Sequence, residues 1–209
     1  ELSRLYFRQR NIAELKKAVI GFAAADREAL TGEQANVLSA IAHFLFERKL
    51  RNEPLQLYSL LIDSGVLDSS IQIRCAECLI AANQFNAAVD ILEPLRQTNT
   101  IADWGLRSLA LAYAGLGKLE LAAAILAEII ERSPSNIHYL RFRLRLLCQL
   151  GDRDAIARLM QTAHSNLGEK GYQDIRITEL VLCADYTALV ELLRNNPGYG
   201  SAAIERDLM

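Results

Sequence analysis

Cys75 and Cys78 are the first residues whose type and spacing could do chemistry, because they stand three residues apart in the segment CAEC. Two cysteines at this spacing occur in redox-active dithiols and as half of many zinc sites. A redox dithiol of this type needs a strand that leads into a helix start, and no strand pattern precedes the segment. A zinc site needs a second pair of ligands, which the sequence lacks. Because residues three apart share a helix face, we interpret both cysteines as small core residues.

The three histidines, His43, His138 and His164, also form no catalytic or metal-binding pattern. They are far apart in the sequence, no glycine-rich phosphate loop follows a strand, and no Ser, His and Asp arrangement suggests a nucleophile. We interpret the histidines as surface or groove residues. The sequence therefore predicts a protein that is not an enzyme and that uses no cofactor or metal.

The composition is that of a globular protein without a strong charge. The chain has 209 residues, of which 51 % are hydrophobic and 23 % charged, and its formal net charge is −2. Such a balance argues against nucleic acid as a partner. Charged residues interrupt each apolar run before the ~20 residues needed to cross a bilayer, so we expect no membrane insertion. With Cys148 and Cys183 the chain has four cysteines in apolar helical stretches. Unpaired thiols of this kind favour a reducing compartment such as the cytoplasm.

The elements that must position these residues are helices. Apolar residues recur at helical spacing along the chain, strand-type alternation is missing, and short polar breaks divide the sequence into about a dozen helices. The breaks are periodic, since each of four turn residues lies 34 residues after the previous one: Lys49, Asn83, Gly117 and Gly151. The sequence thus predicts an all-α chain built from repeated helix pairs.

The segment 103–136 resembles the tetratricopeptide repeat, a helix-turn-helix unit of about 34 residues with the pattern W-x2-L-G-x2-Y…A-x3-F…P. The small residues Ala110 and Ala122 let the two helices approach, and larger apolar residues fill the space around them. The residues at the consensus places are Leu106, Leu109, Ala110, Tyr113, Ala122, Leu126 and Pro134.

Steps of 34 residues extend the resemblance, which weakens after residue 137, where Arg143 and Ile156 replace the expected Leu and Ala. It implies a right-handed α-solenoid of stacked antiparallel helix pairs, either a whole helical-repeat protein or a tetratricopeptide segment of a longer one. We expect one array over 1–209: an irregular N-terminal unit (1–34), four repeats (35–68, 69–102, 103–136 and 137–170) and an irregular C-terminal unit or cap (171–209).

The resemblance also implies a concave groove, lined by the first helices of successive units, with exposed side chains at fixed places. Those places hold Ser39, His43 and Phe46; Ile73, Glu77 and Ile80; Trp104, Arg107 and Leu111; His138, Arg141, Arg145 and Gln149; and Tyr172, Ile175 and Glu179. Among them we select as candidate partner-binding residues Trp104, Arg107, His138, Arg141, Arg145, His43, Glu77 and Tyr172.

Two interpretations remain open for the main candidates. Trp104 is either an aromatic anchor for a partner or a core residue that covers a neighbouring helix. Arg107, Arg141 and Arg145 form either a patch that holds carboxylates bidentately or an ordinary solvated face. In the first interpretation the partner carries acidic residues beside an apolar anchor.

The leading hypothesis is therefore a non-enzymatic scaffold that binds a partner peptide or helix in its concave groove. The alternative is an assembly module of a larger secretion, polysaccharide-export or enzyme-linked protein, with self-association through exposed end repeats.

Overall fold

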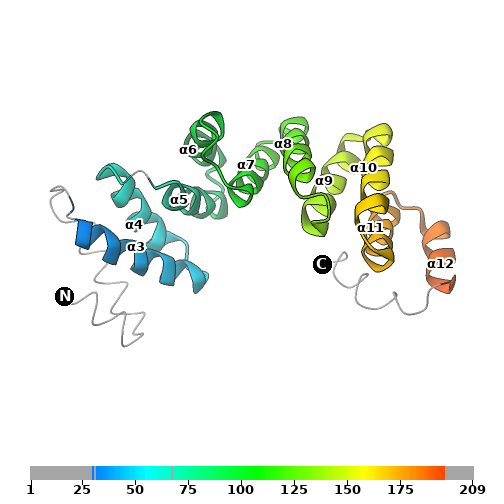
Figure 1. Ribbon diagram of the computed structural model, residues 1–209, viewed down its shortest axis with the longest axis horizontal. Helices are drawn as coiled ribbons and strands as arrows, with labels where there is room; N and C mark the ends of the chain where they lie inside the picture. The colour runs from blue at the N-terminus through cyan, green and yellow to red at the C-terminus, as the bar shows by residue number, and fades with distance from the viewer. Residues whose placement is uncertain (1–29, 31, 67, 196–209) are drawn as a thin grey trace. The chain divides into compact units, whose positions relative to one another are not determined.

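A computed structural model describes residues 30, 32–66 and 68–195 (Figure 1). The helices expected before residue 30 and the final residues 196–209 lie outside the described residues. All regular structure within the described ranges is helical, and no strand occurs there. The predicted all-α fold class is confirmed.

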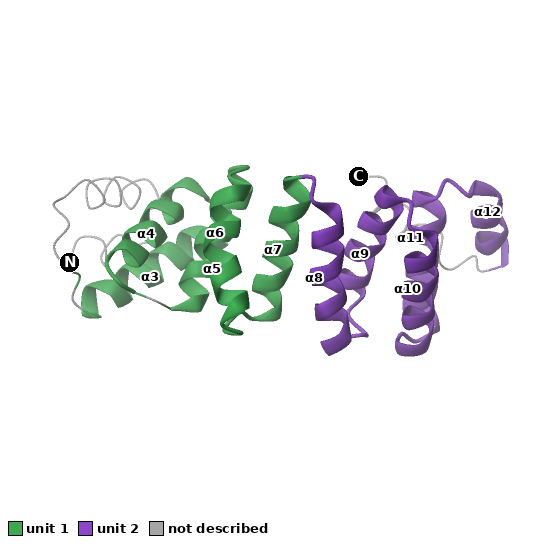
Figure 2. Cartoon of the chain, turned by 90° about the horizontal axis from the view of Figure 1, so that it is seen from above, with its two compact units in different colours: residues 1–116 green, residues 117–209 purple. Residues whose placement is uncertain are grey.

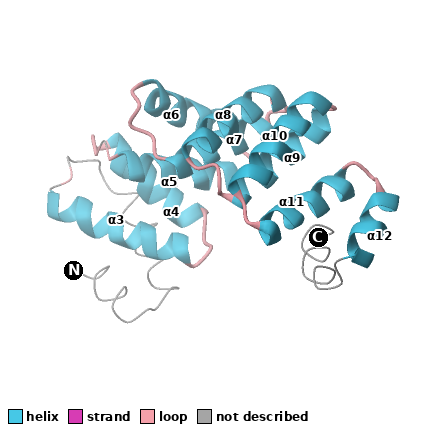
Figure 3. Cartoon of the chain, turned by 45° about the vertical axis from the view of Figure 1, so that its right-hand side comes forward, coloured by secondary structure: helices cyan, strands magenta, loops and turns pink. Residues whose placement is uncertain are grey.

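The described residues form ten helices, which fall two to each predicted repeat and are joined by short loops (Figure 3). They are α3 (Gly32–Glu47), α4 (Asn52–Asp63), α5 (Ser69–Ala81), α6 (Phe85–Gln97), α7 (Asp103–Gly115), α8 (Leu119–Arg132), α9 (Ile137–Leu150), α10 (Arg153–Asn166), α11 (Glu169–Leu182) and α12 (Tyr186–Asn195).

The four periodic turn residues share one backbone conformation. Lys49, Asn83, Gly117 and Gly151 have positive φ angles of 61°, 58°, 74° and 71°. This left-handed conformation ends a helix and reverses the chain, and glycine adopts it without steric cost. The periodicity that the sequence indicates is thus a periodicity of tight turns, two of which are made without glycine.

Two compact units divide the chain: unit 1 is Glu1–Leu116 and unit 2 is Gly117–Met209 (Figure 2). The boundary lies at the turn after α7, within the predicted repeat 103–136. The expectation of one continuous array over 1–209 stays a prediction, and each unit is described separately.

Unit 1 is held together by packing between sequential helices. α3 packs on α4, α4 on α5, α5 on α6 and α6 on α7, and α5 also contacts α7. Ala76 and Ala110, at the predicted small-residue places, are completely buried, as is Leu109 beside them. Pro54 is buried in the first turn of α4, where a missing N–H breaks no helical hydrogen bond.

Unit 2 follows the same packing rule. α8 packs on α9, α9 on α10 and α11, and α11 on both α10 and α12. Asn136 begins α9 by accepting hydrogen bonds from the backbone N–H groups of His138 and Tyr139. The last cluster of buried residues joins α11 to α12 through Ile177, Leu180 and Leu189. Within the described part of the chain, no helix is long and apolar enough to cross a bilayer.

Candidate functional site

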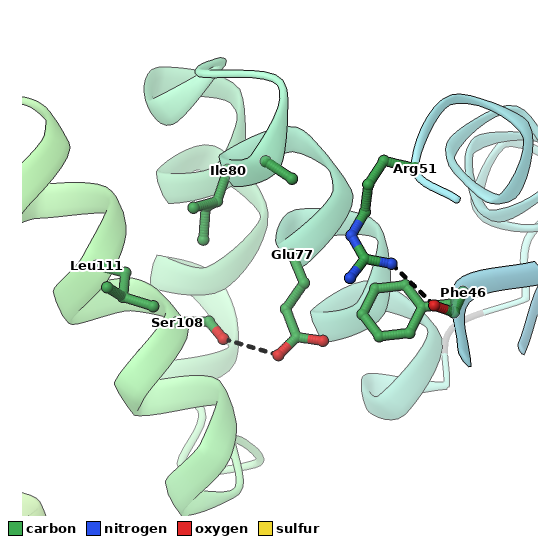
Figure 4. A pocket seen from close by; sticks show the side chains of 7 residues that line it. Phe46, Arg51, Glu77, Ile80, Ser108 and Leu111 are labelled. Atoms are coloured by element: carbon green, nitrogen blue, oxygen red, sulfur yellow. Dashed lines mark hydrogen bonds between the residues drawn. The ribbon is translucent and has the colours of Figure 1, made fainter. Parts of the chain in front are cut away.

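A cavity of about 220 Å³ lies in unit 1, where three first helices meet (Figure 4). α3 contributes Phe46, α5 contributes Glu77, Ile80 and Ala81, and α7 contributes Ser108 and Leu111. Arg51, which directly precedes α4, completes the lining.

Four of the seven lining residues stand at places that the sequence pattern assigns to a groove: Phe46, Glu77, Ile80 and Leu111. Sequence reasoning missed Arg51 and Ser108. Arg51 lies outside the first helices, so their periodicity carries no signal for it. Ser108 follows Trp104 by one helical turn, which places both on one face, and this spacing could have identified it.

Arg51 is held in place by the end of α3. Its Nη1 atom donates hydrogen bonds to the backbone oxygens of Phe46 (2.8 Å) and Leu50 (2.9 Å). The guanidinium carbon lies 4.2 Å from the centroid of the Phe46 ring, within the range of a cation–π interaction. In the parts of the chain that the structure describes, no carboxylate forms an ion pair with Arg51.

A second arginine connects the three first helices beside the cavity. The guanidinium carbon of Arg74 lies 4.7 Å from the ring centroid of Phe46 and 4.9 Å from that of Trp104. Its Nη1 atom donates to Oε2 of Glu77 at 3.1 Å, and Oε1 of Glu77 accepts a hydrogen bond from Ser108 at 3.2 Å. Part of the half-buried Trp104 ring is therefore used within unit 1, against α5.

The other predicted groove residues of unit 1 differ in exposure. His43 and Arg107 are exposed on α3 and α7. Ile73 is only 1 % exposed, so the prediction that its place faces solvent is wrong. A methyl group built on Gly105 would lie 2.7 Å from Cδ1 of Ile73, which shows that this side chain fills the space beside α7. Ile175, at the same place in unit 2, is also buried.

In unit 2 one predicted contact residue already has a partner within the chain. Nη2 of Arg141 on α9 lies 3.7 Å from Oδ2 of Asp174 on α11, and the two side chains are 13 % and 17 % exposed. Arg145 and His138 are exposed on α9. Since Arg107 belongs to unit 1, the single patch predicted from Arg107, Arg141 and Arg145 stays a prediction.

Tyr172, the remaining candidate, is half-buried on α11. Its ring meets the ring of His164 edge to face, with 4.8 Å between the centroids. Both residues belong to unit 2, and the contact fixes the orientation of the tyrosine ring.

The cysteines divide into two kinds. Cys75 and Cys78 are buried, as the core-packing interpretation requires, and burial raises the pKa of Cys78 to about 12. Cys148 is half-buried and Cys183 is exposed, so the expectation that all four are core residues is wrong. Cys183 is exposed because it directly follows α11 and lies at the turn, beyond the packed face. Among the described residues, no group of three or more potential metal ligands occurs.

Comparisons with known proteins give the fold. A scan against family models and a search of curated proteins find no match. Among solved structures, MamA is similar with a TM-score of 0.63 and 14 % identity, over 79 % of this chain and 94 % of that one. A tetratricopeptide repeat protein from Parabacteroides merdae has a TM-score of 0.57 and 11 % identity, over 96 % and 77 % of the two chains. The tetratricopeptide protein TTC0263 from Thermus thermophilus has a TM-score of 0.54 and 16 % identity, over 84 % and 100 %. This chain therefore has a tetratricopeptide-like helical-repeat fold.

Proposed function

We propose that the chain is a non-enzymatic scaffold for protein–protein interaction. The first helices of unit 1 bind a segment of a partner protein in which an acidic residue stands close to an apolar one. The observation that carries this proposal is the cavity between α3, α5 and α7, where apolar side chains lie beside an arginine (Figure 4).

The apolar part of the proposed site consists of Ile80 and Leu111 on neighbouring helices, with the Phe46 ring across the cavity. All three side chains are half-buried. An apolar partner side chain that enters this space removes its own surface and theirs from water, which is worth about 1.5–3 kcal/mol for a fully buried Leu or Phe. This term supplies most of the expected affinity.

The polar part is Arg51, whose Nη1 atom is already bonded to the end of α3. We assign its Nη2 and Nε atoms to a carboxylate of the partner. Because the guanidinium is held before binding, little side-chain entropy is lost when the ion pair forms. Glu77 also lines the cavity, but its charge is balanced by Arg74, so it repels an incoming carboxylate only weakly.

The candidate residues outside the cavity extend the proposed contact. His43, Trp104 and Arg107 lie on the same first helices of unit 1, and His138, Arg145 and Tyr172 lie on the first helices of unit 2. Exposed ion pairs contribute only about 0–1 kcal/mol each, so we assign Arg107 and Arg145 to orientation and association rate.

The test uses a random peptide library displayed on phage and panned against the full chain. We expect the enriched peptides to carry Asp or Glu within one helical turn of an apolar residue. Arg51→Glu should weaken binding of such a peptide about tenfold or more. Arg153→Glu is the matched control, because Arg153 is exposed on the second helix α10 and the change in net charge is the same. Absence of enriched peptides, or equal affinity for both variants, would contradict the proposal.

A second candidate function, self-association through an end of the array, is favoured by exposed apolar residues on α12. Tyr186 and Val190 are 63 % and 47 % exposed and stand four residues apart, on one helix face. If this face mediates assembly, the mass measured by light scattering should rise with concentration. The double change Tyr186→Lys and Val190→Lys should then abolish the rise. A constant monomer mass would exclude this function.

A further inference from the structure

Two contacts tie α9 to α11 in unit 2, and they lie at different levels of the helices. Arg141 meets Asp174, and one to two turns further along both helices the sulfur of Cys148 lies 3.9 Å from the sulfur of Cys183. Because the order of the contacts is the same on both helices, α9 and α11 run parallel. Their carboxyl-terminal ends therefore bring two free thiols together.

We propose that Cys148 and Cys183 are a thiol–disulfide modification site, at which a low-molecular-weight disulfide of the glutathione class converts the pair into an intramolecular disulfide. The cross-link would join the carboxyl-terminal ends of α9 and α11. This proposal is independent of the partner-binding cavity, which lies in unit 1.

The positions of the two residues suit a cross-link. A disulfide bond is about 2.0 Å long, so the sulfur atoms must approach by roughly another 2 Å. Cys183 directly follows α11, and Ala184 after it makes the reversing turn with a φ angle of 56°. Cys183 is exposed, so its side chain can rotate without disturbing a packed core. The other two cysteines, Cys75 and Cys78, are buried and inaccessible to a small disulfide.

Exposure sets the order of the reaction. The thiolate of Cys183 attacks one sulfur of the small disulfide, which forms a mixed disulfide and releases one small thiol. The sulfur of Cys148 then loses its proton to solvent and attacks the sulfur of Cys183. The second small thiol leaves. Two protein thiols are oxidised and one small disulfide is reduced to two thiols, so atoms and electrons balance.

The surroundings of Cys148 support this order. Burial, followed by the neighbouring Cys183 and by Glu179, raises the pKa of Cys148 to about 12. Cys148 therefore stays protonated while Cys183 is attacked. Once Cys183 is an uncharged mixed disulfide, its contribution to that raised pKa disappears and the second step becomes easier. Glu179 is itself paired with Arg176, which moderates its effect.

The experiment treats the reduced full chain with glutathione disulfide, blocks remaining thiols by alkylation and maps the peptides by mass spectrometry. We expect one peptide that links Cys148 to Cys183, with Cys75 and Cys78 alkylated only after unfolding. The cross-link closes a loop of 34 intervening residues, 149–182. It should raise the melting temperature by roughly 5–10 °C.

Variants make the outcome decisive. Cys183→Ser should abolish the linked peptide and the rise in melting temperature, while the matched control that combines Cys75→Ala with Cys78→Ala keeps both. Because Cys183 is exposed, circular dichroism should show Cys183→Ser folded. A glutathione adduct that remains on Cys183 without closing, a disulfide between two chains, or equal reaction of all four thiols would each overturn the proposal.

Discussion

At the residue scale, Arg74 connects more of unit 1 than any position in the repeat pattern suggests. It contacts Phe46 on α3 and Trp104 on α7, and it neutralises Glu77 on its own helix. Cation–π contacts at partly exposed sites are worth about 0.5–2 kcal/mol each. These side chains therefore hold one another in place around the cavity before any partner arrives.

Arg74→Ala should expose the Trp104 ring and leave Glu77 with only its Ser108 contact. We expect a loss of about 1–2 kcal/mol in the free energy of unfolding. The fluorescence emission should also shift to longer wavelength. Trp104 is the only tryptophan of the chain, so its emission reports this site alone. Arg153→Ala, at an exposed arginine in unit 2, is the control. Unchanged emission with unchanged stability would show that the two cation–π contacts contribute nothing.

Some of the site residues could be predicted from sequence and others could not, for a physical reason. Phe46, Glu77, Ile80 and Leu111 occupy repeated places on first helices, so the 34-residue period identifies them. The contact of Arg51 depends instead on where the turn after α3 directs a long side chain. No periodic pattern encodes such a direction.

At the element scale, the small residues between paired helices set how closely the helices pack. Ala110 on α7 is completely buried, so Ala110→Leu forces extra methyl groups into a filled space. We expect a loss of about 1–3 kcal/mol in urea denaturation. Ala40→Leu is the control, because Ala40 is exposed on α3 of the same unit. If both variants unfold at the same urea concentration, Ala110 is not at a close helix contact.

The start of α5 depends on a charged cap. Asp68 accepts hydrogen bonds from the Ser70 hydroxyl and from the backbone N–H groups of Ser70 and Ile71, and these bonds lower the pKa of Asp68. A lowered folded-state pKa stabilises the protein above the unfolded pKa of about 4, and this stabilisation is lost as the pH falls through the folded value.

Asp68→Ala should therefore cost about 1 kcal/mol at pH 7 in urea denaturation. Asp68→Asn keeps an oxygen acceptor and should cost less. Both losses should shrink when the pH is lowered to about 3, because the wild-type carboxylate is then partly protonated. A loss that grows on acidification would show that the cap does not act through its charge.

The helices themselves follow from the sequence because each repeat agrees with the next in turn, small residue and apolar face. The pattern is weakest at Arg143, which replaces an expected Leu on α9. Arg143 is half-buried, and burial followed by the nearby Arg158 lowers its pKa. A long side chain can place its methylene groups in a leucine site and still direct its charge outward, so the helix persists although the consensus fails.

At the scale of the whole molecule, a repeated chain is stabilised by contacts between neighbours, so a local change should have a local effect. The period of 34 residues predicts the architecture for this reason. Contacts that join one repeat to another through unlike residues, such as Arg141 with Asp174, leave no trace in the period and could not be predicted. That ion pair offers a test of how far a local loss extends.

Arg141→Ala leaves Asp174 without its partner at a position that is only 17 % exposed. We expect a loss of about 1–3 kcal/mol, confined to unit 2. Far-ultraviolet circular dichroism reports both units, whereas Trp104 fluorescence reports unit 1. In urea, the variant should begin to lose helix at a lower concentration while the Trp104 midpoint stays unchanged.

Two controls separate the ion pair from other effects of that change. Combining Arg141→Ala with Asp174→Ala removes the uncompensated carboxylate and should recover part of the loss. Arg145→Ala, on the exposed face of α9, should leave the unfolding curve unaltered. If circular dichroism and Trp104 fluorescence instead shift together in Arg141→Ala, the two units unfold as one cooperative body. A change in the groove residues of unit 2 would then also alter the stability of the cavity in unit 1, so binding data from either unit would need correction for stability.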